Sequence, residues 1–160
     1  MKAELQNEHR WLEQLVGTWV TIHETPEMDG NPASSVEWTE TIRSLNGAWL
    51  VFEASGPMGP GETGASVMTL GYDPAKQRYI GNWVGTMMTH MWVYSGSVDA
   101  SGKVLTLDCE GPDFEDPSKT LKYQDIHTIK SKDVRNLTSR CQQADGSWQE
   151  VMTMDYHRKK

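Results

Sequence analysis

The chain has 160 residues, a length that suits one domain with one sizeable core. Its net charge of −7, from 15 basic and 22 acidic side chains, argues against nucleic acid as a partner, because such binding depends on neutralising phosphates. No apolar run is long enough for a transmembrane helix, so no membrane span is expected.

The N-terminal segment has the pattern of a helix. Leu5, Leu12 and Leu15 share one face of a helix over residues 3–16, and Gly17 follows as a stop signal. The opening stretch MKAELQNEHRW is polar where a secretion signal would be apolar, so we expect a cytoplasmic protein.

After Gly17 the apolar residues alternate with polar ones, and turn signals recur about every 8–14 residues. Ten strands are predicted, at residues 18–27, 35–44, 48–55, 64–72, 77–84, 88–98, 103–110, 119–129, 134–143 and 148–158. Because the connections are short, neighbouring strands should pair as hairpins, and a sheet of this size tends to close and lose its edges.

We therefore predict an all-β fold, an antiparallel up-and-down β-barrel of about ten strands. Residues 1–160 form one domain, with a helix at 1–16 near one mouth and the barrel at 17–160. A two-sheet sandwich is the alternative. The stretch GPMGPGETG (56–64) lacks the Gly-Lys-Ser/Thr ending of a phosphate loop, and we interpret it as a flexible hairpin that gates the mouth.

Alternation also sorts the side chains of four strands into two faces, and we place the face richer in aromatic residues and methionine inside. The inner faces are Val36, Trp38, Glu40 and Ile42; Met88, His90, Trp92 and Tyr94; Leu121, Tyr123, Asp125, His127 and Ile129; and Trp148, Glu150, Met152, Met154, Tyr156 and Arg158. A single β-bulge would reverse which side chains of a strand face inward beyond it.

Five ionisable residues fall on these inner faces, namely Glu40, His90, Asp125, His127 and Glu150. Charged groups are rarely buried without partners, so a wet or liganded cavity fits them better than a solid core. We predict non-covalent binding of a small apolar or amphipathic molecule. Its apolar wall would be Trp38, Met88, Trp92, Tyr94 and Met152, and its polar head would meet Glu40, His90, Tyr123, His127 and Glu150.

Other functions stay open on the residues alone. An enzyme could use His90 or His127 beside a carboxylate as an acid–base pair, although no nucleophile motif is present and Cys109 and Cys141 are expected to be buried free thiols. Alternation sends Met88 and His90 one way and Met87 and Met91 the other, so the cluster MMTHM does not converge on one metal ion unless this segment is a loop. A metal site formed by His90, His127 and a carboxylate across the barrel is a further alternative. A homodimer through an outer sheet face is also consistent with the sequence.

The stretch QLVGTWV (14–20) resembles the first strand of the calycin superfamily, the lipocalins and fatty-acid-binding proteins. That resemblance implies that Trp19 packs across the closed end against Arg158. The stretches RSLNGAWLVFEASG, TLGYDPAKQRYIGNWVGTMMTHMWVYSGSVDASGKVLTLDCEGP and DGSWQEVMTMDYHRKK resemble the DUF1579 family of bacterial proteins, over nearly the whole chain. The family is of uncharacterised function, so the resemblance implies a lipocalin-like fold and supplies no catalytic residues to carry over. Some calycin-like barrels hold haem through a histidine, for which His90, His127 and His157 are candidates; no cofactor is assigned.

Overall fold

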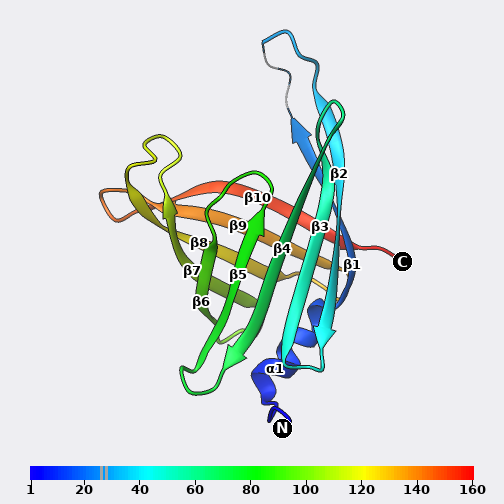
Figure 1. Ribbon diagram of the computed structural model, residues 1–160, viewed down its shortest axis with the longest axis vertical. Helices are drawn as coiled ribbons and strands as arrows, with labels where there is room; N and C mark the ends of the chain where they lie inside the picture. The colour runs from blue at the N-terminus through cyan, green and yellow to red at the C-terminus, as the bar shows by residue number, and fades with distance from the viewer. Residues whose placement is uncertain (26, 28) are drawn as a thin grey trace.

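A short helix lies across one end of a β-sheet in the computed structural model, which describes residues 1–25, 27 and 29–160 (Figure 1). Helix α1 spans Asn7–Leu12 and continues as the 3-10 turn η1, Glu13–Leu15. It is shorter than the predicted helix, because the backbone N–H of Gln6 donates to Nδ1 of His9 at 3.0 Å and caps the helix there. Among the described residues, no helix is long and apolar enough to cross a membrane.

Ten antiparallel strands follow and close into a barrel in which each strand pairs with its neighbours in sequence (Figure 1). They are β1 Gly17–Thr25, β2 Ser34–Leu45, β3 Trp49–Gly59, β4 Glu62–Asp73, β5 Arg78–Gly85, β6 Trp92–Val98, β7 Val104–Pro112, β8 Thr120–Ile129, β9 Val134–Gln142 and β10 Trp148–Arg158. The predicted up-and-down barrel is confirmed and the sandwich alternative is wrong. Part of the predicted first strand and first turn, at residues 26 and 28, lies outside the described residues.

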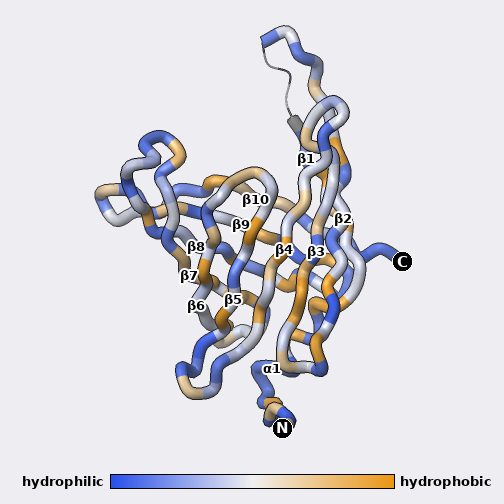
Figure 2. Tube along the Cα trace, in the orientation of Figure 1, coloured by the Kyte–Doolittle hydropathy of each residue, from blue (hydrophilic) through white to orange (hydrophobic). Residues whose placement is uncertain are grey.

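The barrel is solid at the end that carries α1. Leu12 and Leu15 from the helical segment pack there with inward residues such as Leu50, Leu70 and Leu105, all at most 1% exposed. Both hydrophobic and hydrophilic residues occur along the strands in Figure 2, as expected where alternate side chains face a core and solvent. The helix therefore completes a core at this end of the barrel.

Trp19 and Arg158 close the same end, as the calycin resemblance implied. They are register partners of β1 and β10, and the Arg158 guanidinium lies 4.2 Å from the centre of the Trp19 ring. Arg158 also donates to the carbonyl of Val16 at 2.6 Å and to that of Gln14 at 3.0 Å. One side chain thus joins the last strand to the segment that leads into the first.

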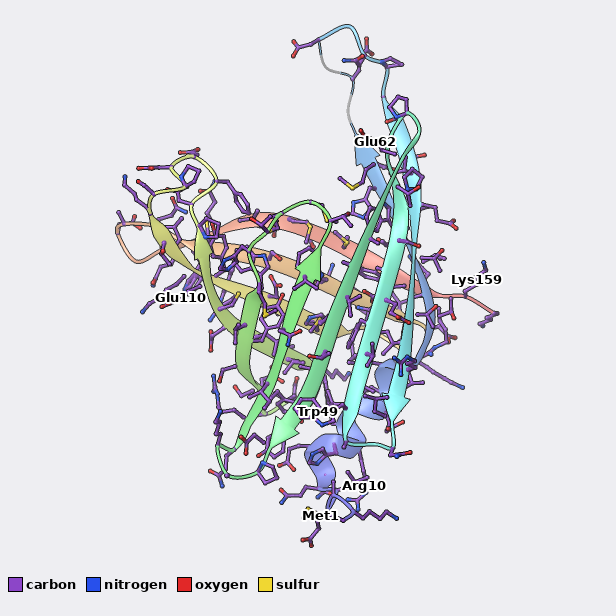
Figure 3. All side chains as sticks on the ribbon, viewed as in Figure 1. Met1, Arg10, Trp49, Glu62, Glu110 and Lys159 are labelled. Carbon is purple, nitrogen blue, oxygen red and sulfur yellow. The ribbon has the colours of Figure 1, made fainter. Side chains whose placement is uncertain are left out.

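The opposite end carries longer and less regular connections. The predicted loop 56–64 is instead a continuation of β3 and β4, and Figure 3 labels Glu62 near the tip of this projecting hairpin. Trp38 of β2 packs against Gly56 and Gly64, where any larger residue would collide with its ring, and its Nε1 donates to the Pro57 carbonyl at 3.1 Å. The hairpin is therefore held against β2 by a side chain.

The segment 86–91 is a loop and not the beginning of a strand, so the predicted strand at 88–98 starts too early. The loop arches from β5 to β6 (Figure 1), and its first residue, Thr86, donates to the Ala65 carbonyl at 2.9 Å. At its other end, Nε2 of His90 lies 3.0 Å from the Glu110 carbonyl oxygen. The loop thus spans from β4 to β7 at the open end.

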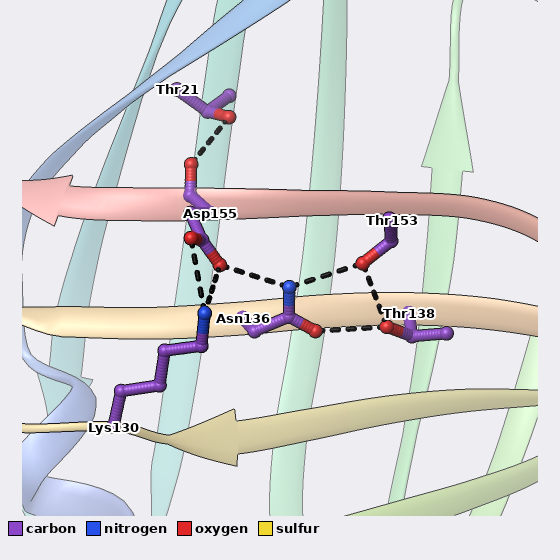
Figure 4. Close-up of polar contacts among 6 residues, drawn as sticks. All are labelled: Thr21, Lys130, Asn136, Thr138, Thr153 and Asp155. Atoms are coloured by element: carbon purple, nitrogen blue, oxygen red, sulfur yellow. Dashed lines mark hydrogen bonds and ion pairs between the residues drawn. The ribbon is translucent and has the colours of Figure 1, made fainter.

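Strand β10 contains a β-bulge, because Glu150 pairs with Arg140 whereas Met152 pairs with Ser139. After the bulge the outer face carries a polar network with β9 (Figure 4). Asn136 donates to Asp155 at 2.9 Å and to Thr153 at 3.1 Å, and Lys130 pairs with Asp155 at 3.0 Å. The alternate residues of both strands consequently face inward, as described next.

Candidate functional site

A cavity of about 320 Å³ occupies the half of the barrel opposite α1. Its walls come from all strands except β7, together with the loops after β5 and β7. The lining residues are His23, Trp38, Glu40, Phe52, Ala54, Ser66, Met68, Trp83, Met87, Met88, Trp92, Tyr94, Phe114, Tyr123, Asp125, His127, Arg135, Leu137, Ser139, Val151, Met152, Met154 and Tyr156. This volume suits a small organic molecule, because ligand sites begin at about 300 Å³.

The buried end of the cavity holds an ion pair. Arg135 on β9 donates through Nη2 to Oε1 of Glu40 on β2, and the Arg135 side chain is only 1% exposed. The guanidinium also lies 4.0 Å from the centre of the Tyr156 ring and 4.9 Å from that of Trp19. Buried charges need such partners, so the pair and the two rings fix each other.

A second polar group lies nearer the mouth. The carboxylate of Asp125 on β8 accepts from the Tyr94 hydroxyl at 2.6 Å and from the Ser139 hydroxyl on β9. Burial raises the pKa of Asp125, although both hydrogen bonds act to lower it. Burial, followed by the charge of Asp125, holds the pKa of Tyr94 well above its ordinary value, so Tyr94 stays a neutral donor.

His127 lies next to the ion pair at the buried end. Burial, followed by the positive charge of Arg135, lowers its pKa to about 3, so the imidazole is neutral near neutral pH. Within the described residues, Nδ1 of His127 and Nε of Arg135 are buried without a hydrogen-bond partner. Burial also raises the pKa of Tyr156, which keeps its phenol protonated. The buried end is polar and incompletely satisfied by the protein.

The remaining wall is apolar and aromatic. The ring of Trp92 meets that of Tyr123 edge to face at 4.9 Å between centroids, and its Nε1 donates to Sδ of Met88 at 3.2 Å. Four lining residues at the mouth are exposed to solvent, namely Met87, Phe114, Val151 and Met152. The cavity therefore runs from an apolar rim to a polar buried end.

Eight of the ten predicted ligand-binding residues line this cavity: Trp38, Glu40, Met88, Trp92, Tyr94, Tyr123, His127 and Met152. His90 and Glu150 do not. The inner position predicted for Glu150 and Trp148 is wrong, because the bulge at Val151 inverts the alternation on that side of it. Val151 consequently lines the cavity in their place.

The alternation predicted for residues 87–91 is also wrong, because this segment is a loop. Met87 and Met88 both line the cavity, whereas His90 and Met91 line a separate pocket on the outer surface together with Glu110 of β7. Figure 3 labels Glu110 on that side of the barrel. The ring of His90 contacts that of Trp92 at 4.7 Å, so it supports the cavity wall from outside.

Arg135, the most deeply buried charge of the site, was not predicted from the sequence. Its strand was assigned no inner face, although Leu137 and Cys141 share the Arg135 phase and are apolar. That signal was present, but an arginine in the inward set does not suggest burial unless its partner, Glu40, is known to lie across the barrel.

Burial, followed by the charges of Asp125 and Asp108, raises the pKa of the Cys109 thiol to about 12, which leaves it a poor nucleophile. Across the part of the chain that the structure describes, no three His, Cys, Asp or Glu side chains gather closely enough to hold a metal ion. Of the haem candidates, His157 and His90 lie outside the cavity and His127 is buried.

Comparisons with known proteins support the fold. The sequence model of a family described as "protein of unknown function (DUF1579)" matches residues 4–158. No curated protein matches the sequence significantly. Among solved structures, the S-type phycobiliprotein lyase CPES from Guillardia theta is similar over 98% of this chain and 99% of its own, with 15% identity and a TM-score of 0.53.

Two further solved structures match with lower TM-scores. A redesigned β-barrel, b11L5F_LGL, has 12% identity and a TM-score of 0.43 over 99% of both chains. EF1p2_mFAP2b bound to DFHBI has 14% identity and a TM-score of 0.42 over 96% of this chain and 100% of its own.

Proposed function

The chain belongs to the DUF1579 family of proteins of unknown function, whose model covers residues 4–158, and we propose that it binds a small amphipathic molecule inside its barrel. The observation that carries this proposal is the gradient of the cavity, from the exposed apolar rim to the ion pair of Glu40 and Arg135. The polar end of the occupant lies inward and its apolar end lies at the rim.

Each part of the wall has a role in this proposal. Trp38, Met88, Trp92 and Met152 contact the apolar part of the occupant, because ligand sites are mostly apolar with a few convergent polar groups. The polar residues that surround the head are Glu40, Tyr94, Tyr123 and His127, together with Arg135, Asp125 and Tyr156. Binding requires no strand to open, since the rim residues are already exposed.

A cavity-filling substitution tests the proposal. Ala54 lines the cavity from β3, so Ala54→Phe places a ring in it, whereas Ser55→Phe puts the same ring on the exposed outer face next to it. We expect Ala54→Phe to weaken binding of the uncharged fluorescent probe N-phenyl-1-naphthylamine by about tenfold or more, because the space is taken. Fluorescence titration of both variants and the unsubstituted protein measures this.

Equal binding by the unsubstituted protein and Ala54→Phe would place the probe elsewhere and contradict the proposal. Circular dichroism of both variants confirms that they remain folded.

A cytoplasmic location and a homodimer also belong to the proposal. The exposed outer-face pair Val67 and Val84 supports the dimer.

A further inference from the structure

The cavity lining carries more acidic side chains than permanently positive ones. Among the described residues that line it, Arg135 is the one permanent cation, whereas Glu40 and Asp125 are both acidic. His127 is buried beside Arg135 and adds no positive charge near neutral pH. An anionic occupant would therefore enter a space whose protein charges sum to zero or below.

Arg135 is also already ion-paired within the protein, although its Nε has no hydrogen-bond partner among the described residues. Its Nη2 is taken by Glu40, and its guanidinium stacks between protein groups within 5 Å of the Tyr156 and Trp19 ring centres. A carboxylate competing for Arg135 would have to displace Glu40, and a second carboxylate left beside the first is unfavourable in a buried site. Arg135 is thus a structural counter-ion to Glu40.

Each acidic group also has a partner within the protein already. Both carboxylate oxygens of Asp125 already accept hydroxyl donors, from Tyr94 and Ser139, and Glu40 holds Arg135. Among the described residues, Nδ1 of His127 and Nε of Arg135 are buried without a partner, and the hydroxyl groups of Tyr156 and Ser66 belong to lining residues. These groups can donate to or accept from a neutral head.

We propose that the cavity takes an amphipathic molecule whose polar end is uncharged, such as an alcohol or an amide, and rejects the carboxylate of a fatty acid. The internal pair of Glu40 and Arg135 enforces this choice by denying a carboxylate its counter-ion. This inference rests on the proposed binding function and specifies its class of ligand.

Three probes with the same ten-carbon tail test the head directly: decanol, decanoate and decylamine, titrated by calorimetry into the full chain near neutral pH. We expect decanol to bind at least about tenfold more tightly than either charged probe, since burying an unpaired charge is costly. Decanoate or decylamine binding as tightly as decanol would overturn the inference. Failure of all three to bind would instead overturn the proposed function.

The variant Glu40→Gln frees Arg135 without changing the shape of the side chain. We expect its affinity for decanoate to rise about tenfold, because a charge-assisted bond to Arg135 replaces the lost one, while decanol changes little. The matched control is Glu37→Gln, which removes the same charge from the exposed face of β2. A gain for decanoate in Glu37→Gln equal to that in Glu40→Gln would show a general charge effect and contradict the inference.

If Glu40→Gln fails to fold, the comparison of decanol with decanoate on the unsubstituted protein still decides the matter. Circular dichroism identifies that case. Unchanged affinity of a folded Glu40→Gln protein for decanoate would also overturn the role given to the ion pair.

Discussion

His127 shows how burial controls the charge of a single residue in this barrel. The side chain is 4% exposed, and burial followed by Arg135 lowers its pKa to about 3. In an unfolded chain a histidine titrates near pH 6.5. Between these two values the unfolded state binds more protons than the folded one, so the free energy of unfolding falls as the pH falls through this range.

We therefore predict an acid-sensitive fold. The contribution of His127 to the free energy of unfolding should fall by about 1.4 kcal/mol per pH unit below about pH 6.5. Asp125 opposes this effect, because its raised pKa lets the folded state take up a proton first as the pH falls. Urea unfolding of the protein and of His127→Asn, between about pH 7 and about pH 4.5, isolates the histidine.

The variant should be less stable at neutral pH but lose less stability on acidification. Replacing the exposed His157 by Asn serves as the control and should leave the pH dependence unchanged. Parallel pH profiles for His127→Asn and the unsubstituted protein would show that His127 is not the acid-sensitive group.

Single residues also show what alternation can and cannot predict. Trp38, Tyr94, Tyr123 and His127 face the cavity because β-strands place alternate side chains on one face, and that rule needs only the sequence. Arg135 was not predicted, because whether an arginine is buried depends on a carboxylate from a strand far away in sequence. Long-range partners of this kind do not leave a local pattern.

At the scale of elements, all ten strands were predictable, since turn residues separated the alternating stretches. Two site residues were predicted wrongly because irregularities interrupt that alternating pattern. The bulge at Val151 turned Glu150 outward, and the loop at 86–91 moved His90 out of the wall. Neither carries a strong local signal, because the same apolar residues also suit a regular strand.

Two glycines let the strands pack closely enough to close the barrel. A Cβ added to Gly96 in β6 would collide with the backbone carbonyl of Thr106 in β7, and one added to Gly81 in β5 would meet that of Thr69 in β4. Backbone atoms in paired strands cannot move aside as side chains can. These positions therefore tolerate no larger residue without a shift of the sheet.

We predict that Gly96→Ala lowers the free energy of unfolding by about 2 kcal/mol through overpacking. The comparison is Gly85→Ala, whose new methyl group would meet the ends of the Trp83 and Met87 side chains. That variant should lose less stability, because these ends lie at the cavity and can turn. Chemical denaturation measures both, and an equal loss in the two variants would contradict the role assigned to the backbone contact.

At the scale of the whole molecule, Arg158 adds side-chain contacts to the backbone pairing that closes the barrel between its first and last strands. Its guanidinium donates to the carbonyls of Gln14, Val16 and Lys132 and lies over the Trp19 ring. The contacts with Gln14 and Val16 join segments that lie near the two ends of the chain. The tryptophan and the arginine were both identifiable beforehand from a family resemblance, whereas composition alone would not have paired them.

We predict that Arg158→Ala lowers the free energy of unfolding by about 3 kcal/mol, because three carbonyls lose a charged donor and the Trp19 ring loses its cation. Arg43→Ala is the matched control, since Arg43 forms an ion pair with the exposed Glu53 at 3.9 Å. An exposed pair of this kind contributes at most about 1 kcal/mol. Thermal or chemical unfolding compares them, and a loss in Arg158→Ala no larger than in Arg43→Ala would contradict the closure by Arg158.

The division of the barrel into a filled end and a hollow end has a consequence for how such proteins diverge. Substitutions around the solid end, among Leu12, Leu50 and Leu105, disturb packing on which folding depends. Substitutions at the rim, as at Met87 or Phe114, change an exposed surface and leave that packing intact. Descendants of one ancestor can therefore exchange their ligands while keeping the same scaffold, so that shared ancestry predicts architecture more firmly than it predicts what each barrel carries.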